Sequence, residues 1–355
     1  MSFAIAPTDF GTLNQILSST YQVKANISQL SEETASGYLA SNYGGLGANA
    51  APALNLTVEI AGNTALQTNT QNASTIQQAA QAALGQIESI ASNFAAQATT
   101  METTEGAVGP VAASAQSALQ QVAGLLNTQV GGVYVFAGQD SNTPPIPDPG
   151  SMTQSAFYTA IATAVSNLGT NGAAATTAAN LAAASPGGTS PFSASLEAAG
   201  AQSEVDLGGG ERVVLAPLAT TNSDASSTGV GTTSTGSYTR DILMSLAQLG
   251  SLTQAQASDP NFLPFVQNTV ATLQGSVSAI NTDIGALGIR QQMVTNAGTE
   301  LSATNTVLQT QLGNLQDADL SQVAAQVSQA QTQLQASYQL LANLGTLSLA
   351  KFLPA

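Results

Sequence analysis

The sequence of 355 residues contains no cysteine and no histidine. Their absence removes thiolate nucleophiles, disulfides, thiolate and imidazole metal ligands, and the side chain most often used for proton transfer near neutral pH. A carboxylate pair is no substitute, because Asp317 and Asp319 stand two positions apart, a spacing that points side chains of a helix in different directions. We therefore predict that the protein is not an enzyme and has no cofactor and no metal site.

Basic residues are almost as scarce, since five lysines and arginines stand against 20 acidic residues and give a net charge of −15. No basic stripe can neutralise the phosphates of a nucleic acid. No run of about 18 apolar residues occurs, and the first residues lack the cationic start and apolar segment of a signal peptide. We predict no nucleic-acid partner, no membrane insertion and, if the chain is exported, no cleaved signal peptide.

Aromatic residues make up only 5% of the chain and tryptophan is absent, while alanine supplies much of the 43% hydrophobic fraction. Any core must then be thin and built from closely approaching helices. Helices of this kind gain much of their stability from packing partners, including other subunits.

Both ends of the chain carry heptad stripes. Apolar or small residues step by three and four from Leu13 to Leu30 and again from Leu320 to Leu344, the spacing that keeps one face of a helix against a partner. Further helices are predicted at about 54–100 and 111–128, and at 242–249 and 266–287. The simplest way to bury both terminal seams is to pair them in an antiparallel hairpin.

The middle of the chain differs in composition. Residues 141–239 are rich in Ser, Thr, Gly and Ala and give weaker helix signals. Within them, SEVDL and ERVVLA flank Gly208, Gly209 and Gly210, which predicts two strands joined by a tight turn. A phosphate-binding loop is the alternative, but no lysine follows the glycines.

These patterns predict a mainly α fold: a long antiparallel helical rod with paired N- and C-terminal coiled-coil helices and an inserted β-containing outer domain. We expect residues 1–45 with 315–355 to form a terminal coiled-coil assembly domain. Residues 46–140 with 240–314 would form a helical rod domain, and residues 141–239 a Ser/Thr/Gly-rich, β-containing outer insertion.

Charged residues in the helical segments have structural interpretations. Asp317 and Asp319 precede the Leu320 stripe, where negative charge stabilises the positive end of a helix dipole. Glu32 and Glu33 are expected on a solvated face at a helix end. For Arg290 we expect a solvated position or an ion pair within the chain, with a contact between subunits as the alternative.

Three segments resemble the flagellin family, which includes the hook-filament junction proteins. They are LQASYQLLANLGTLSLAKFL at 334–353, ASGYLASNYGGLGANAAPALNL at 35–56, and ALGIRQQM at 286–293. The Asp-Asp-Pro of many flagellins after the first helix is missing. The resemblance implies a secreted structural subunit of the extracellular bacterial flagellum, exported through the flagellar type III channel. The implied partners are an export chaperone, other axial proteins (hook-associated proteins and flagellin) and further copies of the chain.

The segment GGVYVFAGQDSNTPPI at 131–146 is similar to the passage of junction proteins into their outer domain. It favours a hook-associated junction protein that joins hook to filament. A filament flagellin is the alternative, and a coiled-coil adhesin or phage fibre subunit is a further one. As a flagellar subunit the protein would assemble through its terminal helices, and the predicted subunit-interface residues are Leu13, Ile16, Val23, Ile27, Leu30, Leu320, Val323, Val327, Leu334, Leu341 and Leu344.

Overall fold

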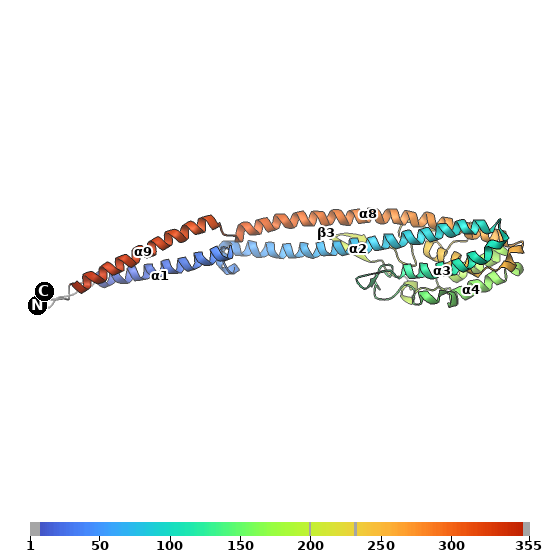
Figure 1. The fold of residues 1–355 in the computed structure, drawn as a ribbon, viewed down its shortest axis with the longest axis horizontal. Coiled ribbons are helices and arrows are strands. Elements are labelled where there is room, and N and C mark those ends of the chain that lie inside the picture. Colours follow the sequence, from blue (N-terminus) through green and yellow to red (C-terminus); the bar gives the residue numbers. More distant parts are fainter. Residues whose placement is uncertain (1–7, 199, 231–232, 351–355) are drawn as a thin grey trace. The chain divides into compact units, whose positions relative to one another are not determined.

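The computed structural model describes residues 8–198, 200–230 and 233–350. Its helices and strands, drawn in Figure 1, are α1 Thr8–Ser36, η1 Tyr43–Asn49, α2 Ala50–Met101, η2 Glu105–Ala107, α3 Val108–Leu126, β1 Gln129–Val130, β2 Val133–Tyr134, η3 Pro149–Gln154, α4 Ala156–Ser166, α5 Leu168–Ala184, α6 Ala194–Glu197, β3 Glu204–Gly208, β4 Glu211–Val214, α7 Tyr238–Ser251, η4 Gln254–Ser258, α8 Phe262–Gln316 and α9 Leu320–Ala350. The predicted mainly α class with a β-containing insertion is confirmed. The chain forms two compact units, residues 1–64 with 302–355 and residues 65–301.

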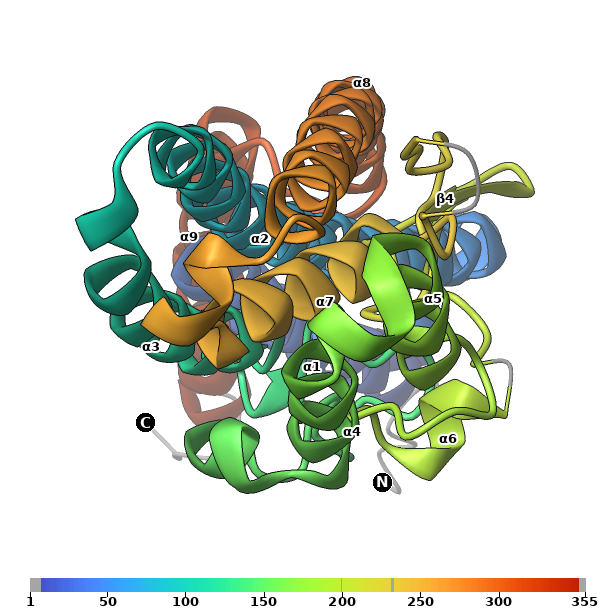
Figure 2. The ribbon, with the colours of Figure 1, turned by 90° about the vertical axis from the view of Figure 1, so that its right-hand side faces the viewer.

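The second unit, residues 65–301, is built around α7. Every residue from Tyr238 to Gly250 is buried, and α3, α4 and α5 pack against this helix (Figure 2). A helix buried on all sides needs no polar face, yet α7 carries Arg240, Asp241, Ser245 and Gln248. Most of these polar groups must therefore find partners inside the unit.

The segment 141–239 is more helical than its composition predicts. It contains α4 and α5, and Phe157, Ile161 and Val165 of α4 belong to the same core cluster as the large apolar residues of α7. Alanine gives α5 a high helix propensity, but its buried face carries Thr176, Thr177 and Asn180. A stripe of small polar residues does not look like a core face in the sequence, and the helix signal is therefore weak.

The predicted hairpin is present. Strands β3 and β4 pair antiparallel, with Val205 opposite Val213, and Gly208, Gly209 and Gly210 all have positive φ angles of 96°, 64° and 88°. Val205, Leu207 and Val213 form a small second core with Ala73 of α2 and Val294 of α8. A second short hairpin, β1–β2, turns at Gly131 and Gly132.

A buried arginine ties the loops of this unit to α7. The Arg240 guanidinium lies 2.8 Å from the Glu197 carboxylate and donates to the carbonyl oxygens of Ala184 (3.0 Å) and Thr220 (3.3 Å). It also stacks over the ring of Phe192, with 5.1 Å to the centroid. One side chain thus holds the end of α5, helix α6 and the segment after β4 in place.

A buried carboxylate, that of Asp283, anchors the segment 222–237 in a similar way. Asp283 of α8 accepts from the backbone amides of Ser223 and Asp224, both at 2.8 Å, and from the Tyr238 hydroxyl at 3.0 Å. Asp224 in turn lies 2.7 Å from Arg290. The expected intramolecular pair of Arg290 is confirmed.

We predict that replacing Arg240→Met lowers the free energy of unfolding of residues 65–301 by about 3 kcal/mol, because it leaves the Glu197 carboxylate, whose side chain is only 21% exposed, without its cation. The measurement is urea unfolding followed by circular dichroism. Arg212→Met is the matched control: Arg212 faces Glu204 at 4.0 Å with both side chains largely exposed, so its loss should cost less than about 1 kcal/mol. Equal losses in the two variants would contradict the anchoring role of Arg240.

Candidate assembly surface

The terminal helices α1 and α9 pack against each other (Figure 1). Their connectors fix an antiparallel pairing: the Leu39 amide donates to the Gln316 carbonyl at 2.7 Å, and the Ala318 amide to the Gly37 carbonyl at 2.9 Å. Gly37 has a φ of 76°, a conformation that glycine adopts without steric cost. The end of α1 therefore lies beside the start of α9.

Eight of the eleven predicted seam residues lie on the face on which the two helices meet. Ile16, Val23, Ile27 and Leu30 on α1, and Val327, Leu334 and Leu341 on α9, are half-buried, and Val323 is buried. Buried Thr20 and Ala330 complete the two stripes. Leu320 is 51% exposed, and the side chains of Leu13 and Leu344 lie outside the described residues. The stripes face each other within one chain, and their role between subunits stays a prediction.

One charged residue of this face was placed wrongly from sequence. Glu33 was expected to be solvated, but it is only 9% exposed and its carboxylate accepts a hydrogen bond from the Gln29 side chain at 2.9 Å. Its position, three residues after Leu30, continues the stripe of α1. Glu32 is exposed as expected.

Asp319 directly precedes α9 and caps its N-terminus, as expected for an acidic residue at a helix start. Its carboxylate accepts from the backbone amides of Ser321 (2.9 Å) and Gln322 (3.2 Å), which satisfies donors that the first helical turn leaves free. The hydrogen bond from Gln322, followed by those from Ser321, lowers the pKa of Asp319 below its usual value of 3.8.

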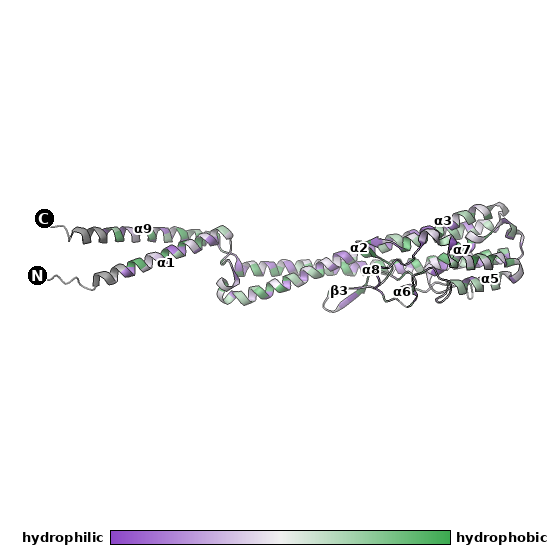
Figure 3. Cartoon of the chain, turned by 90° about the horizontal axis from the view of Figure 1, so that it is seen from below, coloured by the Kyte–Doolittle hydropathy of each residue, from purple (hydrophilic) through white to green (hydrophobic). Residues whose placement is uncertain are grey.

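Large apolar side chains remain uncovered in the unit formed by residues 1–64 and 302–355. Of the fifteen exposed large hydrophobic residues in the described part of the chain, eleven lie here: Leu17, Tyr21, Tyr38, Leu39, Tyr43, Leu54, Val58, Val307, Leu320, Tyr338 and Leu340. By contrast, both hydrophobic core clusters of the described residues lie in residues 65–301. Figure 3 shows apolar residues interleaved with polar ones along α1 and α9.

Sequence reasoning missed most of these exposed residues because it followed a single stripe. Leu17 and Tyr21 each come one position after a seam residue of α1, and Leu340 comes one position before Leu341. Neighbouring helical positions lie about 100° apart around the axis. The signal that could have found them is an apolar face wider than one partner helix can cover.

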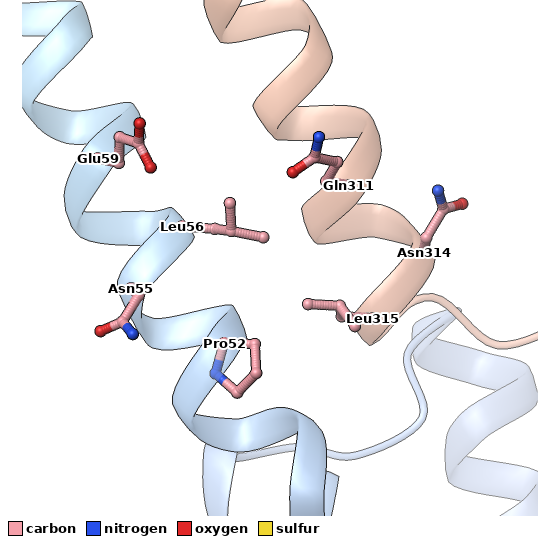
Figure 4. Close-up of a pocket in the computed structure, with 7 residues that line it drawn as sticks. All are labelled: Pro52, Asn55, Leu56, Glu59, Gln311, Asn314 and Leu315. Carbon is pink, nitrogen blue, oxygen red and sulfur yellow. The ribbon is translucent and has the colours of Figure 1, made fainter.

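An open groove lies within the same unit, between the first turns of α2 and the last turns of α8. It has a volume of about 490 Å³ and is lined by Pro52, Asn55, Leu56, Glu59, Gln311, Asn314 and Leu315. Figure 4 shows the side chains of Leu56 and Leu315 pointing into the space between the helices. Pro52 and Glu59 lie two turns apart along α2.

Chemical sites are not evident in the described residues. No group of three or more acidic side chains is placed there to hold a metal ion. The helices in this part of the chain include none that is long and apolar enough to cross a membrane. The exposed apolar surface is therefore the feature that most needs a functional explanation.

Comparison with known proteins gives the family. The model of the bacterial flagellin N-terminal helical region matches residues 12–141, and that of the flagellin C-terminal helical region matches residues 270–353. Together they cover more than half of the chain, which belongs to the flagellin family and is a structural subunit of the bacterial flagellum. The family is structural, and its members are exported to form the extracellular flagellum.

The fold is also similar to a solved structure from Vibrio parahaemolyticus, provisionally described as a flagellar hook-associated protein. The TM-score is 0.50 at 13% sequence identity, over 75% of this chain and 96% of that one. At this identity the likeness concerns the fold alone. No curated protein sequence matches the chain.

We predict that amides of α1 and α9 exchange with solvent much faster than those of α3 and α7 in the dilute monomer. Helices without a core depend on partners for most of their stability. Hydrogen exchange followed by mass spectrometry measures this difference. Equal protection of α9 and α7 in a verified monomer would contradict the prediction.

Asp319→Ala should increase amide exchange in the first turn of α9, because the helix loses its N-cap. Since the pKa of Asp319 is lowered by folding, its contribution is complete above the ordinary carboxyl pKa and is lost as pH falls through the lowered value. Asp319→Asn, which keeps an acceptor oxygen, is the control and should show exchange that lacks this acid-dependent step. A step of the same size in the Asn variant would exclude Asp319 as its origin.

Proposed function

We propose that the chain joins hook to filament as a hook-associated junction protein. Two findings support this role: the segment at 131–146, which is similar to that of junction proteins, and the fold likeness to a protein provisionally described as hook-associated. A filament flagellin is the second candidate, since the family models fit it equally. Membership of the flagellin family sets aside an adhesin or a phage fibre.

The observation that carries the proposal is the uncovered apolar surface of the unit that contains α1 and α9. Eleven exposed large apolar residues in a unit whose terminal seams are half-buried are what a subunit needs when neighbouring copies complete its packing. Residues 1–45 with 315–355 act as the assembly domain, residues 46–140 with 240–314 as the helical rod, and residues 141–239 as the outer insertion.

The seam residues predicted from sequence take part in this assembly, because most of those whose side chains are described are only partly covered and retain surface for a neighbour. The partners are further copies of the chain, other hook-associated proteins and flagellin. Before export through the type III channel, a chaperone covers the same apolar faces. The chain then works outside the cell as part of the flagellum.

The position of the protein on the organelle tests the proposed role. Immunogold labelling of isolated flagella should give a band at the hook end of each filament. Labelling along the whole filament would identify a flagellin instead. The absence of label from intact flagella would contradict both candidates.

We predict that Leu334→Asp combined with Leu341→Asp reduces incorporation into flagella at least about a hundredfold while residues 65–301 stay folded. The two residues lie seven apart on the face of α9 that meets α1, where an unpaired carboxylate costs several kcal/mol. Motility and electron microscopy of a strain that carries only the variant measure the effect.

The matched control is Gln335→Asp with Ala342→Asp, which adds the same charges at exposed positions of the same helix. We expect flagella of normal appearance in the control strain. Normal filaments on hooks in the Leu334 and Leu341 variant would exclude the seam from assembly.

A further inference from the structure

The groove between α2 and α8 has the features of a receiving surface for a helix. Its walls are the side chains of Leu56 and Leu315, Gln311 lies on the side of α8 that faces α2, and the carboxylate of Glu59 lies toward one end, whereas the amides of Asn55 and Asn314 point outward (Figure 4). The groove is open and has a volume of about 490 Å³, which leaves room for side chains of a helix laid along it. Apolar walls with one amide and one carboxylate beside them select an occupant that is largely apolar and carries a cation.

Glu59 forms no ion pair with another described residue. Three ion pairs join described residues, and none includes Glu59. The unit formed by residues 1–64 and 302–355 contains two basic residues, Lys24 and Lys351, and Lys351 lies outside the described residues. The candidate cation on the described surface of this unit is therefore Lys24.

Lys24 lies on an exposed ridge of α1 that matches the groove. Leu17, Tyr21 and Lys24 follow the spacing i, i+4, i+7 and so share one face of the helix, next to the face that meets α9. All three are exposed, and Tyr21 is the most exposed of them at 71%. Lys24 also has no ion pair with another described residue.

The ridge is far from the groove of its own chain. Lys24 comes twelve residues before Ser36, the last residue of α1, which is about 18 Å along the helix axis. The groove begins only after the connector and η1, at Pro52. A second copy is therefore needed to bring the two surfaces together.

We propose that the groove between α2 and α8 receives the Leu17, Tyr21 and Lys24 ridge of a second copy of this chain, with the Lys24 ammonium paired to the Glu59 carboxylate. This inference rests on the proposed function as a subunit that contacts copies of itself. The Tyr21 ring lies between Leu56 and Leu315, and its hydroxyl reaches the Gln311 amide. Tyrosine suits such a place because it has an apolar body and a polar tip.

Charge makes this pairing selective. Two copies that each carry a net charge of −15 repel one another in general, and the ridge presents one of the few cations available. Ridge and groove are different surfaces, so the contact is heterologous and repeats from copy to copy. Such contacts generate a closed ring or a helical row rather than a twofold dimer.

The chain contains no cysteine, so introduced thiols test the contact without background. Flagella are isolated from a strain carrying the double variant Lys24→Cys with Glu59→Cys and are treated with a short bis-maleimide cross-linker. We expect a ladder of covalent dimers and larger multimers of this chain. The control is Asn26→Cys with Glu59→Cys, in which the thiol at 26 is exposed on another side of α1, and it should stay monomeric.

The possible results distinguish a failure of the groove contact from a failure of the proposed function. If the double variant is present in flagella but gives no multimers, or if the control gives the same ladder, the groove contact is overturned while the subunit role stands. If the unmodified protein is absent from isolated flagella, the proposed function fails and the groove contact fails with it.

Charge reversal tests the ion pair itself. Lys24→Glu and Glu59→Lys should each reduce incorporation into flagella by about tenfold, because each places like charges opposite one another. The double reversal restores an opposite pair and should recover most of the incorporation. A double variant as poor as the two single variants would overturn the Lys24 to Glu59 pairing.

Discussion

The shortage of large apolar side chains is the constraint on which the rest of the structure depends. Aromatics are 5% of the residues and alanine is abundant. Contact with a single neighbour therefore buries little apolar surface on a long helix. A helix stabilised mainly by packing must then collect several neighbours. The two units of the chain meet this requirement in different ways.

Residues 65–301 meet it internally. Helix α7 is covered on all sides by other elements of the unit, and the loops around it are fixed by the guanidinium of Arg240 and the carboxylate of Asp283. Polar groups buried in this way stabilise the fold only when their partners are complete. Two of the five basic residues of the chain, Arg240 and Arg290, form ion pairs that hold this unit together.

The sequence predicted the parts of the structure that depend on regular spacing. The paired terminal stripes, the hairpin at Gly208 to Gly210 and the helix start at Asp319 all follow from local rules. Helix α5 was missed because its buried face is threonine and asparagine, and the length of α8 because its apolar stripe weakens after Leu287. In both helices, contacts with other elements of the fold determined the secondary structure, and the sequence of the segment alone does not reveal those contacts.

The candidate site was predictable only in part for a related reason. A heptad stripe identifies the face that one helix presents to one partner, as it did for Ile16, Val23 and Leu30. It does not find a second apolar face such as Leu17 and Tyr21, or a groove whose walls come from Leu56 and Leu315, far apart in the sequence. Those features can be recognised only in the folded structure, which shows which apolar side chains remain exposed to solvent.

Weak internal packing of the terminal helices fits a subunit that completes its fold on assembly. A segment that orders on binding spends part of its interaction free energy on that ordering, so its contacts with neighbours must be extensive. The low charge and the wide apolar faces of α1 and α9 provide such contacts, whereas the core around α7 does not depend on them. Stability and assembly can therefore be altered by separate substitutions, because the residues that serve each lie in different compact units.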